Sequence, residues 1–425
     1  GLVFSRDLTH FPTPLNAPVA TSPHILIVGG GVTRLVNAWI LLDQGYRVTI
    51  LSKEWASYGK AQRLTSQIAG ALWEYPPAVC GQHTDSISLQ HSKRWSMITY
   101  HIWDAIAACP GLAELSGVQV RVADAFFPVP IEEDPDQLSK MLEIMSGGVR
   151  GFRRDPGIIK ERRVNPAYGA VDAYEHLAPV IDTDACMDFL KKLVTAKGAN
   201  LITRTIIGDL FDQEGSLRAE YSVDVLVNST GLSSAELAGD ASCYPIRGGL
   251  IRVINDGINF PKVDHALSIA AGAVHDSNGI CSTTRLSHLI VFIVPRNDNI
   301  LLIGGIAEPH ESKLSLTLDS PIIKRMRARC EEFLPGLKKA RLDSEYPIAQ
   351  GLRPFRQRNV RVERELRLHS QVENGTSSVS RIVHSYGQGG AGWSLSFDCA
   401  GDVLTLVEEA LLDVPARPMT LEKAM

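Results

Sequence analysis

The sequence predicts an α/β protein in which a doubly wound, mostly parallel sheet is joined to an inserted domain rich in antiparallel strands. Two observations indicate this class. Near the N-terminus an apolar strand, a glycine turn, a helix and a second strand follow one another, and later strand-like runs at 249–254, 288–295 and 300–305 alternate with turns. Parallel strands joined by a helix belong to a sheet that binds its ligand at the carboxyl ends of the strands. Short runs separated by turns are typical of an antiparallel sheet.

Size and charge limit the class of protein. With 425 residues, of which 44% are hydrophobic and 21% charged, the chain can form a large core, and we expect two joined domains. The formal net charge of −4 gives no reason to expect nucleic acid or an anionic membrane as a partner, and no apolar run is long enough to cross a bilayer. The dispersed cysteines, without a C-x-x-C pair, predict buried thiols rather than a disulfide frame or a zinc site.

The parallel sheet is predicted from "HILIVGGGVTRLVNAWILLDQGYRVTILSKE". A strand over 24–28 leads into a glycine turn, and a helix over 32–44 follows. In a dinucleotide-binding turn, Gly29 and Gly31 allow the tight bend and the approach of the backbone to a pyrophosphate. The second strand ends at Glu54, roughly where an acidic residue meets ribose hydroxyls, although a solvated charge at a strand end explains it equally well.

Arg34 stands at the third position of the pattern G-x-G-x-x-G, where glycine permits close packing of the helix on the strand. Its long stem is expected to leave this interface, with the head in water or on a phosphate or an acid. The extra volume is expected to cost about 1–3 kcal/mol and to weaken cofactor retention relative to glycine. A positive head close to a pyrophosphate is the route by which Arg34 would instead help, and loss of the cofactor is a further alternative.

A second candidate binding element is "GLRPFRQRNVRVE" (351–363). Gly351 and Pro354 bracket Arg353 in a rigid turn that presents one guanidinium. This planar fork donates paired hydrogen bonds to a carboxylate, which is either that of a ligand or a structural one. The nearby arginines are expected to be surface charges: Arg356, Arg358 and Arg361.

A third element is "HSYGQGGAGWSLS" (384–396), which places four glycines in six positions before a helix. A backbone without side chains approaches a flat ring closely, and a helix N-terminus stabilises negative charge, such as that at the N1–C2 edge of a reduced flavin. The other interpretation is a mobile glycine loop. The amphipathic helix that follows favours an ordered turn.

The remaining segments are expected to be a surface arm, a helix over 85–108, short strands and loops over 110–180, and an Asp-capped helix that ends at Gly198. A buried strand that ends in a turn is expected in "SVDVLVNSTGLSS" (222–234). The predicted domains are an arm over 1–23, a discontinuous nucleotide-binding domain over 24–110, 178–245 and 345–415, and a substrate domain over 111–177 and 246–344.

Several short motifs follow one another along the chain. They are the Gly29/Gly31 turn, "AGALW" (69–73), "RGFRR" (150–154), "VDVLVNSTG" (223–231), "PIRGG" (245–249), "FIVP" (292–295), "LLIGG" (301–305), "GLRPFR" (351–356) and "HSYGQGGAGWS" (384–394). In this order they resemble the D-amino acid oxidase family of FAD-dependent oxidoreductases, over about residues 24–412. The resemblance implies a Rossmann-like FAD-binding domain with an inserted antiparallel β-rich substrate domain.

The resemblance also implies the reaction. An amino acid would be oxidised to its imino acid by hydride transfer from Cα to FAD, dioxygen would be reduced to hydrogen peroxide, and the imino acid would hydrolyse to a 2-oxo acid and ammonia. Such chemistry needs mainly a neutral amine and a Cα held against the flavin. This agrees with the lack of a catalytic triad or metal-ligand spacing in the sequence.

The resemblance assigns site residues as well. Arg353 would clamp the substrate α-carboxylate, and the Gly390 carbonyl would receive the amine. The residues implied around the substrate are Arg353, Gly390, Phe292, His288 and Glu74. Those implied around FAD are Gly29, Gly31, Val32, Thr33, Ser52, Lys53, Glu54, Ser66, Ala69, Gly70, Ala71, Leu72, Thr205, Ile206, Ser229, Gly231, Gly387, Gly389, Gly390, Gly392 and Ser394.

Three of these positions depart from the family. Phe292 aligns with a usual tyrosine, so one hydrogen bond to the carboxylate, worth roughly 1 kcal/mol, is lost. His288 falls near the position of another tyrosine and either replaces the missing donor or is a structural histidine. Glu74 stands where a neutral polar residue is more usual. If it faces the pocket it favours a substrate with a second cationic or donor group, and if it faces solvent it has no such role.

Other functions stay open. A related FAD amine oxidase or dehydrogenase could act on a secondary amine or a specialised metabolite, and a non-catalytic homologue could bind a carboxylate through Arg353. A nicotinamide-dependent dehydrogenase is disfavoured, because the loop over 387–392 would have no task in it. We expect an amino-acid or amine substrate and dioxygen as partners, no nucleic acid and no membrane, with a homodimer as a compatible assembly. The expected location is the cytoplasm or the peroxisome, without a clear targeting signal.

Overall fold

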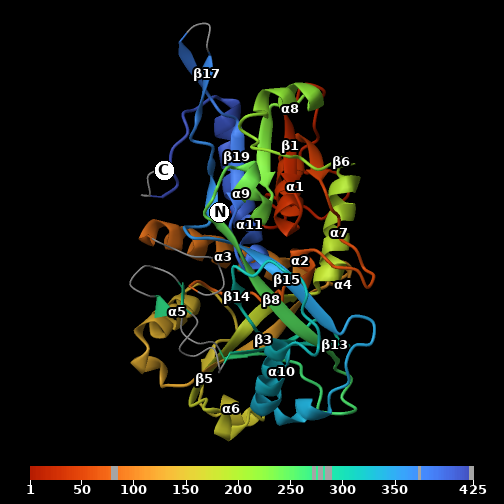
Figure 1. Cartoon of the computed structure of the whole chain (residues 1–425), viewed down its shortest axis with the longest axis vertical. Helices are drawn as coiled ribbons and strands as arrows, with labels where there is room; N and C mark the ends of the chain where they lie inside the picture. The colour runs from red at the N-terminus through yellow and green to blue at the C-terminus, as the bar shows by residue number, and fades with distance from the viewer. Residues whose placement is uncertain (78–84, 270–273, 276–280, 283–289, 372–374, 421–425) are drawn as a thin grey trace.

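The computed structural model describes residues 1–77, 85–269, 274–275, 281–282, 290–371 and 375–420. Its described residues form two large sheets, one in each half of the molecule (Figure 1). In the view of Figure 1 the upper half holds β1, β6 and β19 with helices α1, α7, α8 and α11, and the lower half holds β3, β5, β8 and β13 with α10. The predicted combination of a parallel and an antiparallel sheet is confirmed.

The first sheet has the strand order β16-β19-β7-β1-β2-β6. Its strands are β1 (His24–Gly29), β2 (Arg47–Ser52), β6 (Asn200–Thr203), β7 (Val225–Ser229), β16 (Arg361–Arg364) and β19 (Ile382–Tyr386). All neighbours pair in parallel except β16 and β19. The central strands are buried on both faces because helices cover them, which explains their continuous apolar runs.

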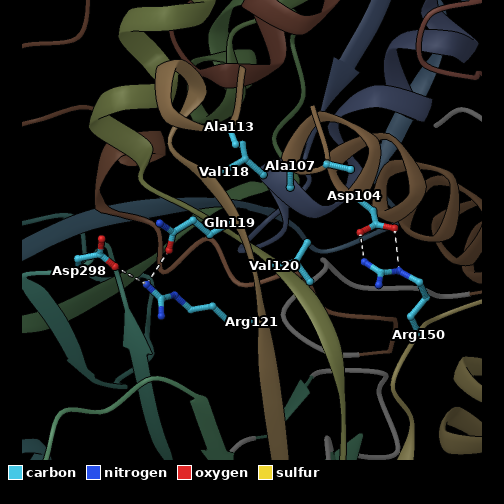
Figure 2. Close-up of a pocket in the computed structure, with 10 residues that line it drawn as sticks. Asp104, Ala107, Ala113, Val118, Gln119, Val120, Arg121, Arg150 and Asp298 are labelled. Carbon is cyan, nitrogen blue, oxygen red and sulfur yellow. Dashed lines mark hydrogen bonds and ion pairs between the residues drawn. The ribbon is translucent and has the colours of Figure 1, made fainter. Parts of the chain in front are cut away.

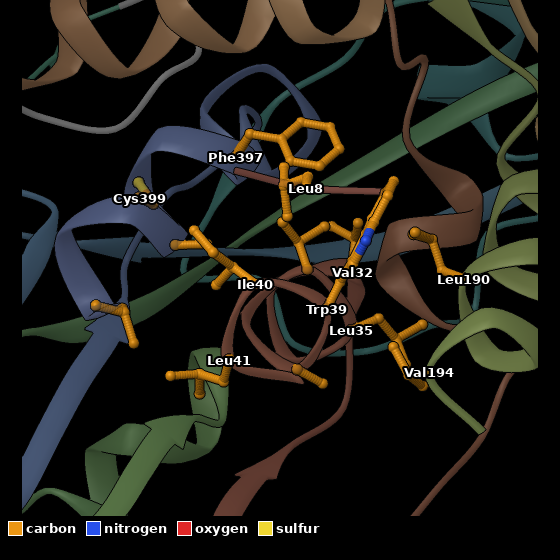
Figure 3. Packing of buried hydrophobic residues seen from close by; sticks show 14 of the residues in the cluster. Leu8, Val32, Leu35, Trp39, Ile40, Leu41, Leu190, Val194, Phe397 and Cys399 are labelled. Atoms are coloured by element: carbon orange, nitrogen blue, oxygen red, sulfur yellow. The ribbon is translucent and has the colours of Figure 1, made fainter. Parts of the chain in front are cut away.

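Helices α1 (Val32–Gln44), α3 (Ser86–Ala107), α7 (Thr183–Ala196) and α11 (Gly392–Leu411) supply the core of this half. Figure 3 shows Trp39 of α1 between Phe397 of α11 and Leu190 of α7. The Trp39 and Phe397 rings meet edge to face with centroids 5.5 Å apart. Helix α7 begins after Asp182 as predicted, but the Asp182 side chain accepts no capping hydrogen bond, so that detail of the prediction is wrong.

The N-terminal arm is attached to α1 through one buried carboxylate. Leu8 lies in the core, and the backbone N–H groups of Thr9 and Leu15 donate to the two oxygens of Asp43 at 2.8 and 2.9 Å. Lys197 Nζ lies 2.7 Å from Asp43 Oδ1, and both side chains are fully buried. Asp43 therefore holds the arm, α1 and the end of α7 together.

The second sheet has the order β14-β8-β13-β12-β9-β3-β5-β4, with β15 paired to β8. Its strands are β3 (Val118–Phe127), β4 (Arg153–Arg154), β5 (Asp172–Ile181), β8 (Cys243–Ile254), β9 (Ala266–Ile269), β12 (Val291–Pro295), β13 (Ile300–Gly304), β14 (Glu308–Pro309) and β15 (Ile348–Arg356). Only β3 and β9 pair in parallel. Strand β15 joins this sheet although its residues fall in the range expected for the nucleotide-binding domain.

The segment over 110–180 differs most from its prediction. Instead of short strands and loops it contains β3 and β5, each of ten residues, which pair along their full length. Asp172 and Pro179 within β5 disfavour a strand locally, and the pairing with β3 overrides that preference. Helix α5 (Pro135–Ser146) lies in the same segment.

The other elements are short, apart from one helix. They are α2 (Thr65–Ile68), α4 (Leu112–Ser116), α6 (Ile158–Glu161), α8 (Glu214–Tyr221), α9 (Ser234–Leu237), α10 (Pro321–Phe333), β10 (Val274–His275), β11 (Cys281–Ser282), β17 (Leu368–Gln371) and β18 (Thr376–Val379). Within the described part of the chain, no helix is both long and apolar enough to cross a bilayer.

Candidate functional site

The glycine bend over 387–392 and the first glycine turn, which holds Gly29 and Gly31, lie next to each other. A Cβ built on Gly392 would lie 3.7 Å from a methyl carbon of Val32, so the N-termini of α11 and α1 are neighbours. Ser66 joins them: its hydroxyl accepts from Val32 N–H at 2.9 Å, and its carbonyl accepts from Trp393 Nε1–H at 2.8 Å. Two helix N-termini at one point favour an anionic ligand such as a pyrophosphate.

The glycine turn of α1 is tight on one side and open on the other. A Cβ on Gly29 would lie 2.4 Å from the Ser229 carbonyl, and one on Gly31 would lie 2.6 Å from Ser66 Oγ. A Cβ on Gly30, by contrast, would meet nothing within 4 Å. The turn can therefore receive a ligand against its backbone, which is the fit that the pyrophosphate of FAD requires.

Other predicted cofactor residues lie near the carboxyl ends of the parallel strands. Lys53 and Glu54 after β2, and Thr205 after β6, are exposed, while Ile206 is buried. Arg204 N–H donates to the Ser52 carbonyl at 2.9 Å, which brings the segments after β2 and β6 together. This is the edge at which a doubly wound sheet binds its ligand.

Arg34 corrects the sequence-based expectation. Its side chain is buried rather than directed to water: one guanidinium nitrogen donates to the carbonyls of Gly29 and Glu54, each at 3.1 Å, and to the Ser52 hydroxyl. The guanidinium also lies 4.4 Å from the centre of the Trp55 ring. Burial lowers the pKa of Arg34 to about 10. The Arg34 guanidinium thus connects β1 and β2. The close packing of the helix on the strand was expected to exclude it from this interface.

Replacement of Arg34 with glycine is expected to lower the stability of the FAD-free protein by about 2–4 kcal/mol, because hydrogen bonds and buried volume are lost together. Thermal unfolding of the apoprotein measures this. Arg34→Met, which keeps volume without donors, should have an intermediate effect. A higher melting temperature, or tighter FAD binding, for Arg34→Gly would show that overpacking dominates instead.

The loop over 69–74 runs beside β5. Ile181 N–H donates to the Ala71 carbonyl at 3.1 Å, and Trp73 N–H donates to the Pro179 carbonyl at 3.0 Å. Ala71 has a φ of +52°, so the loop turns sharply there. Arg296, which is 4% exposed, donates to the carbonyls of Ala69 and Ile181 and fixes this loop. Sequence reasoning missed Arg296, since nothing local distinguishes an arginine after a strand.

Phe292 lies against this loop. A Cβ built on Gly70 would come within 2.3 Å of the Phe292 ring, so glycine is required there unless the ring moves. Phe292 pairs with Gly304 on one side and with Ser268 on the other. His288 lies outside the described residues.

Arg353 lies beside the glycine bend. Gly389 N–H donates to the carbonyl of Pro354, the next residue, at 3.0 Å, and Gly389 takes a φ of +62°, which favours glycine. The Arg353 guanidinium packs on Gly248, and its Nη2 donates to the Ile306 carbonyl at 3.0 Å. Within the described residues, no carboxylate lies within ion-pair distance of it. Burial lowers the pKa of Arg353 to about 10.

The other arginines of this segment behave differently. Arg356 pairs with Asp240 at 2.8 Å and Arg361 pairs with Glu363 at 2.8 Å, and these side chains are only 11% and 12% exposed. The expectation that both are surface charges is wrong: Arg356 pairs with Asp240, which is distant in sequence, and Arg361 pairs with Glu363 on the same strand. A guanidinium that faces inward without a partner carboxylate is suited to bind an anionic ligand, and Arg353 meets that description.

Glu74 lies close to the N-terminus of α11. Its backbone N–H donates to Ser394 Oγ at 3.3 Å, and its carbonyl accepts from Ser96 Oγ at 2.8 Å. Burial raises the pKa of the Glu74 carboxyl, while the positive charge of Lys140 opposes the rise. The Glu74 charge in turn helps to raise the pKa of Tyr174 on β5. Glu74 is half-buried.

His176 on β5 packs edge-on against Trp73, and burial lowers its pKa to about 4. Unfolded histidine titrates near pH 6.5, so the unfolded state binds the extra proton first and stability falls as the pH drops from about 6.5 toward 4. His176 contributes at most about 3 kcal/mol to this loss of unfolding free energy. When the free energy of unfolding in urea is measured against pH, His176→Gln should reduce the slope between pH 6.5 and 4. The slope that remains comes in part from His384, which is similarly buried. An unchanged slope would contradict the assignment.

The pocket in Figure 2 is a separate surface feature. It lies along α3, α4 and β3, and its charged residues neutralise one another: Arg150 pairs with Asp104 at 2.6 Å, and Arg121 pairs with Asp298 at 3.4 Å. None of the predicted site residues lines it.

Comparisons with known proteins agree with this arrangement. The family described as DAO, FAD dependent oxidoreductase, matches residues 24–404. The chain is 28% identical over 386 residues to a D-amino-acid oxidase of Rubrobacter xylanophilus, covering 91% of this chain and 96% of that protein. It is 28% identical over 382 residues to a D-amino-acid oxidase of Streptomyces coelicolor, covering 90% and 96%.

A solved structure shares the fold. Glycine oxidase from Geobacillus kaustophilus superposes with a TM-score of 0.63 at 18% identity, over 91% of this chain and 95% of that one. The family match extends from the first glycine turn to α11 and so includes every element of the site. The chain belongs to the DAO family and is an FAD-dependent oxidoreductase.

Proposed function

We propose that this enzyme oxidises a D-amino acid to its imino acid, with dioxygen reduced to hydrogen peroxide and the imino acid hydrolysed to a 2-oxo acid and ammonia. The observation that carries the proposal is the Arg353 guanidinium, which packs on Gly248 and has no carboxylate partner within the described residues, while the next residue, Pro354, accepts a hydrogen bond from Gly389. The two relatives named D-amino-acid oxidase, each matched over most of its length, support it.

Each part of the site has a task in this reaction. Arg353 binds the α-carboxylate through paired charge-assisted hydrogen bonds. The Gly390 carbonyl accepts from the neutral amine, and Phe292 gives the pocket an apolar wall. These contacts hold Cα in one orientation and keep water away, which lowers the entropic part of the barrier. Bound FAD supplies the acceptor for the hydride.

The residues that would hold FAD come from both glycine-rich turns. The α1 turn and Ser66 would hold the pyrophosphate, while Ser52, Lys53, Glu54, Thr205 and Ile206 would border the adenosine. Ala69, Gly70, Ala71 and Leu72 would lie along the flavin, with Ser394 and the backbone of Gly387, Gly389, Gly390 and Gly392 at its other edge. Val32, Thr33, Ser229 and Gly231 would complete the contacts.

A peroxide-coupled assay on purified, FAD-loaded protein tests the proposal, with a panel of D-amino acids, L-amino acids, glycine and secondary amines. We expect peroxide with D-amino acids, and loss of the flavin absorbance when they are added without oxygen. Turnover confined to secondary amines, or to a dye acceptor in place of dioxygen, would replace the proposal with a related amine oxidase or dehydrogenase. Protein that retains no flavin would indicate a carboxylate-binding homologue.

A further inference from the structure

Strand β15 and the glycine bend are in contact at successive residues. Gly389 N–H donates to the Pro354 carbonyl at 3.0 Å. A Cβ built on Gly389 would lie 2.8 Å from the Phe355 ring, and one built on Gly387 would lie 2.7 Å from Cδ of Arg356. Both glycines have a positive φ, which few other residues adopt. The backbone of the bend therefore rests on the last three residues of β15.

Asp240 joins the two segments through one carboxylate oxygen. Its Oδ2 atom accepts from Arg356 Nε at 2.8 Å and from the Tyr386 hydroxyl at 2.7 Å. Arg356 is the last residue of β15, and Tyr386 is the last residue of β19, directly before the bend. The other oxygen, Oδ1, accepts from the backbone N–H and the hydroxyl of Ser242 at 3.0 and 2.5 Å. The carboxylate is thus fixed on one side and connects β15 to the bend on the other.

The groups around Asp240 are closely packed. The Asp240 and Arg356 side chains are each 11% exposed. Tyr386 is fully buried, and its hydroxyl also accepts from Arg361 at 2.8 Å. Partial burial acts to raise the pKa of Asp240, but the Arg356 charge and the hydrogen bonds from Ser242 and Tyr386 hold it well below its usual value. Asp240 is therefore ionised at neutral pH, and its hydrogen bonds are of the stronger, charge-assisted kind.

Resting on the proposed function, we infer that Asp240 is a positioning residue for the reaction. It fixes the Gly390 carbonyl, in the bend, relative to the Arg353 guanidinium, on β15. These two groups would bind the amine and the carboxylate of one substrate, so their separation determines where Cα lies. Arg353 also pairs with Ile246 on β8, and this pairing holds β15 in place without Asp240. The bend is therefore the part that moves when Asp240 is replaced.

Asp240→Asn is expected to lower the rate of anaerobic flavin reduction by a D-amino acid about 30-fold or more, since an error of about 1 Å in position costs about 100-fold. The amide keeps the shape of the side chain but loses the charge that Arg356 and Tyr386 share. A rate constant measured by rapid mixing describes only folded, FAD-loaded molecules, so a lower yield of folded protein does not affect it. Tyr386→Phe removes one of the two contacts and should lower the rate about fivefold.

Binding of a carboxylate without an amine separates positioning from a general loss of structure. Hexanoate can bind Arg353 but offers nothing to the Gly390 carbonyl. In thermal-shift titrations of the holoenzyme, its dissociation constant should be the same in Asp240→Asn as in the unmodified enzyme. D-Norleucine adds an α-amino group to the same carbon chain, and it should need a higher concentration in the variant to reach the half-maximal rate of flavin reduction. A difference between these two ligands is the signature of a displaced bend.

Asp343→Asn is the matched control. Asp343 is a similarly buried carboxylate that pairs with Arg252 at 3.2 Å, toward the other end of β8, and the variant should lose stability without a change in the rate of flavin reduction. An Asp240→Asn enzyme that reduces its flavin at the unmodified rate, or that loses hexanoate and D-norleucine binding equally, would overturn the positioning role and leave the proposed function standing. An unmodified enzyme whose flavin no D-amino acid reduces would overturn the proposed function instead.

Discussion

Arg353→Ala is expected to lower kcat/KM for a D-amino acid by about 1000-fold or more, a loss of about 4 kcal/mol of transition-state stabilisation. The guanidinium both binds the carboxylate and orients Cα, so its removal affects binding and geometry together. Arg353→Lys should recover only part of the loss, because an ammonium lacks the planar fork that matches a carboxylate. Steady-state peroxide formation and the rate of anaerobic flavin reduction measure both effects.

Arg358→Ala is the matched control, since it removes one positive charge from the segment that follows β15. It should change kcat/KM by no more than about twofold, because Arg358 is not among the residues predicted to contact the substrate or FAD. A primary amine that lacks the carboxylate, as a poor alternative substrate, should be turned over equally by Arg353→Ala and the unmodified enzyme. Equal losses for substrates with and without a carboxylate would show that Arg353 acts only on folding.

Asp43→Asn is expected to destabilise the protein by about 3–5 kcal/mol, because it leaves the fully buried Lys197 ammonium without its counter-charge. Burial already lowers the pKa of Lys197, and Asp43 is the group that opposes this. The same carboxylate accepts from Thr9, Leu15 and Trp39, so the arm should detach from α1. A fall in melting temperature of about 3–6 °C is expected.

Asp188→Asn controls for the loss of a carboxylate on α7. Asp188 pairs with Lys192 one turn away, and both side chains are largely solvated, so less than about 0.5 kcal/mol should be lost. Proteolysis of the N-terminal arm gives a second measurement. If Asp43→Asn and Asp188→Asn unfold at the same temperature with the same proteolysis rate, Asp43 does not hold the arm.

Local pattern was sufficient for much of the fold. Strand β1 and helix α1 begin and end within about one residue of their predicted bounds, because the apolar period, the glycine turn and the short connection restrict the backbone strongly. The glycine bend before α11 was predictable for the same reason. Strands β3 and β5 were not, since the polar residues within them are compatible with a strand only once the two are paired.

For the site, the sequence by itself determined which residue types and turns are present: the glycine fingerprint, the rigid turn that holds Arg353, and the motif order of an FAD-dependent oxidoreductase. Only the tertiary structure decided the partners of the charges. Arg356 and Arg361 are paired where Arg353 is not, Arg34 turns inward onto Ser52, and Asp43 meets a lysine 154 residues away. The physical reason is range: backbone geometry depends on near neighbours, whereas the free energy of a buried charge depends on groups that folding brings together from distant parts of the chain.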